Sequence, residues 1–379
     1  MIVKIQSFVQ KAIVLAILTL CSLFLAAQEM LPLPKFNYIE KNMPRAKLVL
    51  VKEISSDFDS DLFFAVPKSI CAGENGVFFV YDSKLMKIFI FDRFYQCIGT
   101  CLEKGAGPAE VLPKNNIEIN AGLDGNLYTC DTYGDKIIQF SAATGKYKKD
   151  FKLRRIHITQ SPFRPVVDKL GCFYVFSVNN GIVDKLDQNF KNVLHTYLDL
   201  NVNKKFLVFK PSFHPFLMRG NPPRWVLPDF FNTMCDVTNE GQLFIFSFRS
   251  ATAFLFDKNN KLLKQFNIYI DRVLLAYKKD MEEMIETENK NSPGKINTLQ
   301  SQIFLNCFLD RDEPYFYLQL NGAGMVLYKF ALTGKLVRVI TRAGENGSIN
   351  ATIQAKKNGL FYGLSIKEGN PMIFKEKYD

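Results

Sequence analysis

Short runs of aromatic and β-branched residues, separated by polar turns, recur along most of the chain. In each repeat a glycine or another turn residue precedes a first apolar run, and a polar turn leads to a second run that usually ends in Phe. Runs such as "GVFFVYD" and "GQLFIFSF" are apolar at successive positions, as expected of strands buried between stacked sheets. Val, Ile, Tyr and Phe also favour strands. The repeats begin near Glu74, Leu123, Lys169, Asn239, Arg311 and Lys357.

Two positions within the repeat keep the same rhythm. The leading turn residues, at separations of 49, 46, 70, 73 and 45 residues, are Gly76, Gly125, Gly171, Gly241, Pro314 and Gly359. The second runs, at separations of 49, 46, 70, 74 and 44 residues, end at Phe91, Phe140, Leu186, Phe256, Phe330 and Phe374. A period of about 40–50 residues built from short strands is typical of a propeller blade. The pattern therefore predicts an all-β fold, a six-bladed β-propeller over residues 46–379, with insertions at about 209–232 and 271–295.

The last repeat lacks a strand, and the start of the chain offers one. Only three strands are predicted after the fifth repeat, at about 350–356, 360–365 and 372–375, before the sequence ends at Asp379. Near the other end, "AKLVLVKEI" from Ala46 to Ile54 alternates as a strand should. We expect this N-terminal strand to complete the last sheet and close the ring, because pairing removes an exposed edge.

The stretch "EKGAGPAE", residues 103–110, is predicted to join the outer strand of the first repeat to the inner strand of the second. Gly105 and Gly107 permit tight backbone, and Pro108 has no N–H to donate to a ladder. "TRAGENGS", residues 341–348, occupies the corresponding joint before the last repeat. A phosphate-binding loop would need Gly-Lys-Ser/Thr at the head of a helix, and neither joint has it.

The order of these elements resembles a known family. A "G-x-G-P-x-E" loop, an alternating strand, "DGNLY", "KIIQF" and "TGK" follow one another between residues 105 and 146. This order is similar to that of exported bacterial six-bladed β-propellers related to NHL repeats, although Ala109 stands where that family more often has a third glycine. The resemblance covers about residues 46–379 and implies fold and export, but little about activity, since propellers host many functions.

The first 27 residues read as an export signal, followed by a linker over residues 28–45. Lys4 and Lys11 give a positive start, and "AIVLAILTLCSLFLAA" from Ala12 to Ala27 is uncharged, apolar and shorter than the ~20 residues of a spanning helix. We expect cleavage near Ala27 and a periplasmic or cell-surface location. A lipoprotein anchored at Cys21 is the alternative and would be the reason for any membrane attachment.

The net charge bears on the class of partner, and the cysteine content bears on disulfide bonding. The whole chain carries a net charge of +11, and its densest basic stretch is "GKYKKDFKLRR" at 145–155. We interpret this stretch as an exposed outer strand in which Lys blocks edge pairing, and expect no nucleic-acid partner because of export. The seven cysteines beyond the signal are expected to be mostly buried free thiols, with Cys97 and Cys101 as the close pair.

The two insertions are candidates for recognition. The first, "FKPSFHPFLMRGNPPRWVLPDFFN" at 209–232, is too rich in proline for a helix or inner strand. It carries His214, Arg219, Arg224 and Trp225, and aromatic residues with Arg are common in binding sites. The alternative is a loop that only covers the side of a blade. The second insertion has helical spacing over 271–291 and is predicted to be a short helix on the propeller surface.

The crossing loops supply four further candidate site residues. Propeller sites form where blade-crossing loops and inner strands meet around the central opening. Glu110, Arg164, Arg342 and Glu345 fall in such loops and could line a pocket there. Structural loop charges are the common alternative.

Catalytic and metal-binding patterns are sparse. The histidines His157, His195 and His214 are far apart in sequence, and no G-x-S-x-G elbow is present. The series Asp57, Asp59 and Asp61 begins like a calcium loop but lacks its later glycine and glutamate. An acidic linker is the preferred interpretation, with no metal site or cofactor assigned, and Ca²⁺ is the alternative.

The sequence thus favours an exported, monomeric and non-catalytic propeller that binds a carbohydrate, peptide or envelope protein. The alternative is a metal-dependent hydrolase or lyase with its site in the central funnel. A purely structural interaction module is a third hypothesis.

Overall fold

The computed structural model describes residues 35–37, 43–55, 63–113, 117–131, 134–153, 164–177, 182–197, 233–247, 252–269, 304–320, 326–342, 351–366 and 368–378. The chain divides into two compact units, Met1–Lys35 and Phe36–Asp379, and the short strand β1 (Lys35–Asn37) stands at their boundary. Everything below concerns the larger unit.

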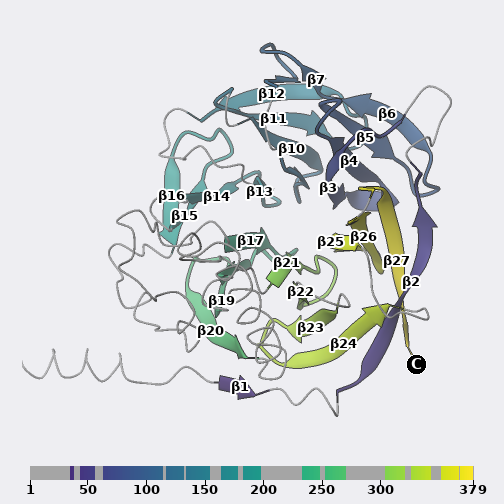
Figure 1. Cartoon of the computed structure of the whole chain (residues 1–379). Helices are drawn as coiled ribbons and strands as arrows, with labels where there is room; N and C mark the ends of the chain where they lie inside the picture. Colours follow the sequence, from purple (N-terminus) through teal and green to yellow (C-terminus); the bar gives the residue numbers. More distant parts are fainter. Residues whose placement is uncertain are drawn as a thin grey trace, which may run out of the picture. The chain divides into compact units, whose positions relative to one another are not determined.

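The larger unit is built from sheets in which most neighbouring strands are antiparallel, and the described residues are almost entirely strands and turns (Figure 1). The first four repeats form the first to fourth sheets, and the strands that each repeat contributes follow one another in sequence order. The first sheet contains β3 (Pro67–Ala72), β4 (Phe78–Asp82), β5 (Lys87–Phe91) and β6 (Cys97–Cys101). The second contains β9 (Ile119–Ala121), β10 (Asn126–Asp131), β11 (Lys136–Ser141) and β12 (Tyr147–Lys152). The third contains β13 (Val166–Val167), β14 (Phe173–Ser177), β15 (Ile182–Leu186) and β16 (Val193–Tyr197). The fourth contains β17 (Thr233–Val237), β18 (Leu243–Ser247), β19 (Thr252–Phe256) and β20 (Leu262–Tyr269).

The last two repeats share one sheet of eight strands, because the N-terminal strand β2 (Arg45–Glu53) lies between them. Along one edge β2 runs antiparallel to β27, with Leu50 opposite Phe374 and Glu53 opposite Met372. This confirms the predicted pairing of the N-terminal strand with the last strand. Along its other edge Arg45 to Leu48 run parallel to β24, a contact the sequence did not predict. The remaining strands are β21 (Phe304–Leu309), β22 (Tyr315–Leu320), β23 (Leu327–Ala331), β24 (Leu336–Arg342), β25 (Ala351–Lys357), β26 (Leu360–Ser365) and β27 (Pro371–Tyr378).

The sheets follow one another around a common centre in a propeller-like arrangement (Figure 1). The innermost strands are neighbours, since β3 lies beside β9 and β25, and β17 lies beside β13 and β21. Apolar side chains fill the space between consecutive sheets. Phe78 of the first sheet also packs on Tyr362 of the last repeat, with ring centroids 5.4 Å apart. The chain's first and last repeats are therefore packed together like any other neighbouring pair.

The turn residues that marked the repeats have the backbone conformation that explains them. Gly76, Gly125, Gly171, Gly241 and Gly359 all have φ between 75° and 80°, the left-handed region that glycine adopts at least cost. Each lies between the first and second strand of its repeat. The sequence period is thus set by the hairpin that follows every innermost strand.

Several predictions from the sequence fall outside the described residues. These are the signal peptide at 1–27, most of the linker at 28–45, the Asp57–Asp61 series, and both insertions at about 209–232 and 271–295. Across the ranges that the structure does describe, no helix has the length and apolar character needed to cross a bilayer.

Candidate functional site

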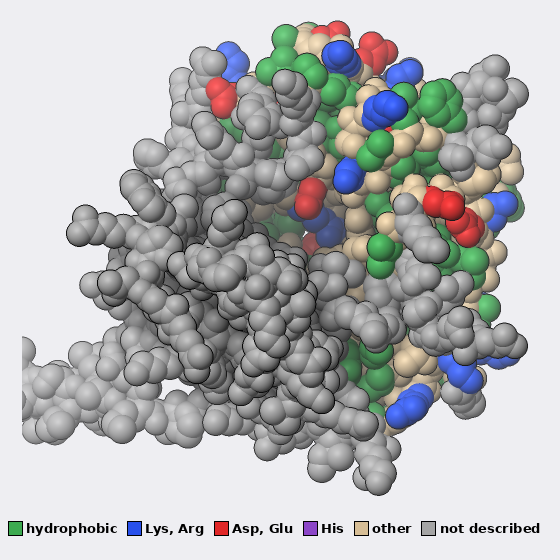
Figure 2. All heavy atoms as spheres, viewed as in Figure 1, with side chains coloured by type: hydrophobic (Ala, Val, Ile, Leu, Met, Phe, Trp, Pro, Cys, Tyr) green, Lys and Arg blue, Asp and Glu red, His purple; other side chains and the backbone are tan. Residues whose placement is uncertain are grey.

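Polar side chains from different repeats converge where the innermost strands meet. Asn120 lies on β9, Arg164 precedes β13, Asp236 lies on β17, and Arg311 follows β21. We refer to these four residues as the central cluster. Figure 2 shows acidic and basic side chains around the hollow at the centre of this face.

Asp236 is the anion of the central cluster, and its side chain is almost completely buried. Arg311 Nη2 donates to Asp236 Oδ1 at 2.9 Å, and Arg164 Nη2 lies 3.8 Å from Asp236 Oδ2. Both arginines also donate to Asn120 Oδ1, at 2.9 Å from Arg164 and 3.2 Å from Arg311. Asn120 Nδ2 in turn donates to the Pro165 carbonyl at 2.7 Å. The cluster therefore links the second, third and fourth sheets to the start of the fifth repeat.

Little free volume remains inside the central cluster. Arg164, Asp236 and Arg311, together with Gln354 and Lys356 of β25, surround a space of about 10 Å³. A space of about this size holds a single water molecule. The central cluster therefore connects the repeats across the centre and leaves no room for a ligand larger than water.

A second ionic group lies beside the central cluster. Lys356 Nζ contacts Asp310 Oδ2 at 2.5 Å and Glu313 Oε2 at 3.5 Å, and Lys329 Nζ contacts Glu313 Oε2 at 3.3 Å. Burial raises the pKa of Asp310 above its ordinary value, although the charge of Lys356 opposes that rise. Burial alone would lower the pKa of Lys356, but its two carboxylate partners leave it above its ordinary value. The lysine and the aspartate thus form a buried ion pair next to the central cluster.

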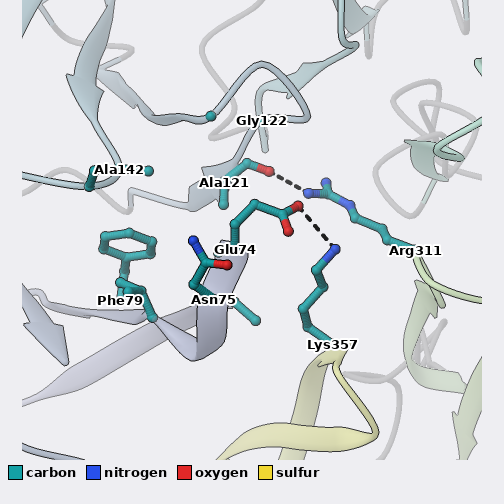
Figure 3. A pocket seen from close by; sticks show the side chains of 13 residues that line it. Glu74, Asn75, Phe79, Ala121, Gly122, Ala142, Arg311 and Lys357 are labelled. Atoms are coloured by element: carbon teal, nitrogen blue, oxygen red, sulfur yellow. Dashed lines mark hydrogen bonds and ion pairs between the residues drawn. The ribbon is translucent and has the colours of Figure 1, made fainter. Parts of the chain in front are cut away.

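A cavity of about 270 Å³ opens next to Arg311, between the first hairpins of the first and second sheets (Figure 3). Lys357, at the end of β25, reaches it from the last repeat. Its Nζ contacts Glu74 Oε1 at 3.0 Å and Asp312 Oδ1 at 2.9 Å. In Figure 3 the Glu74 and Lys357 side chains point toward one another, and the Arg311 guanidinium points toward the Ala121 carbonyl, to which its Nη1 donates.

Small residues create the space in this cavity. Its walls include Ala72, Gly73, Ala121, Gly122, Gly125, Ala142 and Ala143, with Val77 and Phe79 as the larger apolar contributors. A side chain at Gly73 would press on the Phe79 ring, since an added Cβ would come within 3.0 Å of it. The cavity therefore joins an apolar wall to two buried cations, Lys357 and Arg311, and one exposed carboxylate, Glu74.

Glu118 is an acidic residue that interacts with Arg164 of the central cluster. It precedes β9, and its side chain is exposed to solvent. Burial among the surrounding protein nevertheless raises its pKa, and the positive charge of Arg164 opposes this. Because the charge of Arg164 acts on it, Glu118 lies near the central cluster.

Glu110, a candidate site residue from the sequence, is used within its own loop. The strands β7 (Glu103–Lys104) and β8 (Glu110–Val111) run parallel, and the Gly107 amide donates to Glu110 Oε2 at 2.6 Å. A Cβ added at Gly105 would overlap the Glu110 carboxylate. Lys136 Nζ donates to the Gly107 carbonyl at 2.6 Å and fixes the loop to the second sheet. The glycines of this loop therefore make room for the glutamate that closes it.

The other predicted site residues do not gather in one described place. Arg164 lies in the central cluster. Arg342 ends β24, where its backbone lies opposite Leu48 of β2, and its side chain lies outside the described residues. His214, Arg219, Arg224, Trp225 and Glu345 also lie outside the described residues.

Sequence reasoning missed Asn120, Asp236, Arg311 and Lys357. A signal was present for two of them, since Asn120 and Asp236 each stand five residues before the turn glycine of their repeat, Gly125 and Gly241. Cys71 and Val166 occupy this position before Gly76 and Gly171. Gln354 stands five residues before Gly359 and also lines the central space, so a polar residue at this innermost position marks the centre of the molecule.

Groups suited to metal or covalent chemistry are scarce among the described residues. No cluster of three or more His, Cys, Asp or Glu side chains that could hold a metal ion is found in that part of the chain. All seven described cysteines are free, including Cys97 and Cys101. Burial raises the pKa of Cys71 and of Cys235 to about 12 in each case, so both thiols stay protonated and are poor nucleophiles near neutral pH.

Comparisons with known proteins identify no family for this chain. No protein-family model matches it, and no curated protein matches it significantly. Among solved structures, a catalytically inactive virginiamycin B lyase from Staphylococcus aureus, solved with quinupristin, has a TM-score of 0.47 at 8% identity, covering 90% of this chain and 98% of its own. Raptor from Chaetomium thermophilum has a TM-score of 0.45 at 10% identity, covering 89% of this chain, which spans 30% of Raptor's length. BamB from Moraxella catarrhalis has a TM-score of 0.36 at 11% identity, covering 83% of this chain and 84% of its own. Because each of these three scores is below 0.5, the propeller-like assignment rests on the chain's own sheets.

Proposed function

We propose that this protein is an exported, non-catalytic β-propeller that binds a carbohydrate, a peptide or an envelope protein at the cell envelope. We interpret the shared eight-stranded sheet as two blades joined through β2, which gives six blades and agrees with the resemblance to NHL-related propellers. The N-terminal segment at 1–27 supports export through its apolar run and small-residue end.

The cavity between the first and second sheets is the observation that carries this proposal. Ligand sites are typically concave, mostly apolar and supplied with a few polar groups. This cavity combines an alanine, glycine and phenylalanine wall with Lys357, Glu74 and Arg311. Its volume of about 270 Å³ lies just below the ~300–1,000 Å³ of sites for drug-sized ligands. It therefore suits a single sugar ring or one to two amino-acid residues at the end of a longer ligand.

Binding fits the cavity better than catalysis. A hydrolase or lyase needs a nucleophile or a general base held ready for proton transfer. Of the residues that line the cavity, Glu74 carries a carboxylate, and Lys357 holds it in an ion pair. Arg311, which also lines the cavity, already donates hydrogen bonds to Asp236, Asn120 and the Ala121 carbonyl.

A screen of envelope glycans and peptides against the purified chain tests the proposal. Ala143 is exposed and lines the cavity, so Ala143→Trp should fill its mouth without disturbing the core, and we expect at least about a tenfold loss of affinity for any ligand found. Thr144→Trp places the same side chain one residue further along the same turn, outside the cavity lining, and should leave binding unchanged.

Two outcomes would contradict the proposal. Equal binding by both tryptophan variants would remove the cavity as the site. Stoichiometric Ca²⁺ or Zn²⁺ in the purified chain, lost in Glu110→Gln or Glu345→Gln, would instead favour the metal-dependent hydrolase or lyase.

A further inference from the structure

The ion pair at the cavity joins two side chains with very different surroundings. The Lys357 side chain is 7% exposed, whereas that of Glu74 is 63% exposed. Burial alone would lower the pKa of Lys357, but hydrogen bonds to Asp312 and Glu74 leave it above its ordinary value. Lys357 is thus a buried cation that lines the cavity and is paired there with two carboxylates.

Glu74 holds its position in front of Lys357 weakly. It begins the one-turn 3-10 helix η2 (Glu74–Gly76), which is fixed by backbone hydrogen bonds between Gly73 and Val77 and between Val77 and Glu74. Among the described residues, Lys357 is the one partner of the Glu74 carboxylate. An ion pair with so exposed a carboxylate contributes little to stability. Rotation of the Glu74 side chain alone would free one face of the Lys357 ammonium, with no movement of the backbone.

We propose that the cavity recognises a carboxylate, with Lys357 as the cation that binds it and Glu74 as the internal carboxylate that the ligand displaces. This inference rests on the proposed binding function and specifies its ligand class. The incoming group would take the place of a carboxylate that already has the matching charge and size. The rest of the ligand would lie against the apolar wall formed by Ala72, Ala121, Ala142 and Phe79.

The second partner of Lys357 selects for a single negative charge. Asp312 Oδ1 lies 2.9 Å from Lys357 Nζ and remains there when Glu74 moves away. A doubly charged phosphate bound at Lys357 would be repelled by this neighbour, since like charges at such a distance are costly. A monocarboxylate repeats the arrangement already present with Glu74. Uronic acids and the carboxyl ends of peptides share this chemistry.

Calorimetric titration of the purified chain at low salt separates these possibilities. The probes are D-glucuronate and N-acetyl-L-alanine, with D-glucose and N-acetyl-L-alaninamide as their uncharged counterparts. We expect each acid to bind more tightly than its uncharged counterpart. Preference between the two acids then tells a uronic acid from a peptide carboxylate.

Three variants test the roles of the two side chains. Glu74→Gln removes the competing carboxylate and should raise affinity for the acids by about two- to fivefold, the range that corresponds to an exposed ion pair. Lys357→Met keeps the buried stem, removes the charge, and should lower affinity by about tenfold or more. Glu103→Gln removes an exposed carboxylate outside the cavity lining and should leave the affinity for both acids unchanged.

The outcomes distinguish this inference from the function on which it rests. If the uncharged probes bind as tightly as the acids, and Ala143→Trp abolishes that binding, the binding function stands and carboxylate recognition is wrong. If Glu74→Gln leaves affinity for the acids unchanged, Glu74 is not displaced and the inference is wrong. If none of the four probes binds, the cavity is not a carboxylate site. Because Glu74 is exposed, its variant remains informative even if Lys357→Met does not fold.

Discussion

At the scale of single residues, the centre of the molecule depends on Asp236. Its carboxylate is the buried anion between two guanidinium groups that come from different repeats. Burying charge is costly, and the cost is offset here by pairing and by shared hydrogen bonds to Asn120. Removing one partner leaves the others buried and uncompensated.

We therefore predict that Asp236→Ala lowers the free energy of unfolding by about 3–5 kcal/mol, measured by urea denaturation. Glu313→Gln is the matched control, because its carboxylate also contacts lysines but is half exposed, and it should cost less than about 1 kcal/mol. Equal losses in the two variants would mean that the central cluster is no more important than a surface ion pair.

The sequence revealed only part of this site, for a physical reason. Arg164 could be placed near the centre because it precedes an innermost strand, whereas its partner Asp236 lies 72 residues further along the chain. Arg311 lies another 75 residues on. Which charges meet depends on how the sheets pack. Glu110 shows the opposite case, since the turn geometry of its loop directs its carboxylate back onto Gly107.

At the scale of the elements, the turn glycines are the reason that the repeat could be recognised in the sequence. The "TGK" turns that precede the outermost strands add a second constraint, because a side chain in place of their glycines would collide with the preceding sheet. A Cβ added at Gly334, where φ is +91°, would lie 2.8 Å from Cδ2 of Phe266. One added at Gly125, where φ is +77°, would meet open space. The two glycines thus share a backbone conformation and differ in their surroundings.

Alanine substitution separates backbone strain from packing between sheets. Gly125→Ala should cost about 1–2 kcal/mol, the penalty for an L-residue in the left-handed region. Gly334→Ala should cost a further ~1–3 kcal/mol, because the Phe266 ring must move within a packed core. Urea denaturation of both variants gives the comparison. Equal costs would show that the close approach to Phe266 has no energetic consequence.

At the scale of the whole molecule, buried tyrosines from several sheets link stability to alkaline pH. Tyr128, Tyr174 and Tyr317 occupy second strands and donate to Asp124, Asp168 and Asp310. Burial, reinforced by these carboxylates, raises the pKa of each, and burial raises the pKa of Tyr362 to about 12. A raised pKa means that the folded state holds the proton more tightly than the unfolded state.

The free energy of unfolding should therefore be independent of these tyrosines below their ordinary pKa of about 10 and fall above it. Each buried tyrosine removes about 1.4 kcal/mol per pH unit until its folded pKa is reached. We predict a steep cooperative loss of circular dichroism above pH ~10, accompanied by a rise in tyrosinate absorbance. A full tyrosinate signal that develops while the circular dichroism persists would contradict this.

The closure of the unit was the most predictable long-range contact, because one repeat was a strand short and one unassigned strand was available. The sequence could not show that β2 would also pair with β24, since that contact depends on two outermost strands approaching each other. As a consequence, β2 pairs with the fifth repeat along one edge and with the last repeat along the other.

Leu48 tests whether this strand holds both neighbours. It is fully buried among side chains of the last two repeats, while Leu50, on the same strand, is 36% exposed. Leu48→Ala should cost about 2–5 kcal/mol and Leu50→Ala less than about 1 kcal/mol. Because β2 pairs with β24 and with β27, hydrogen exchange in Leu48→Ala should accelerate in both strands and spare β10 and β11 of the second sheet. Acceleration in β27 without β24 would mean that the parallel pairing contributes nothing to stability. Uniform acceleration through all sheets would mean that the whole ring opens as one cooperative unit.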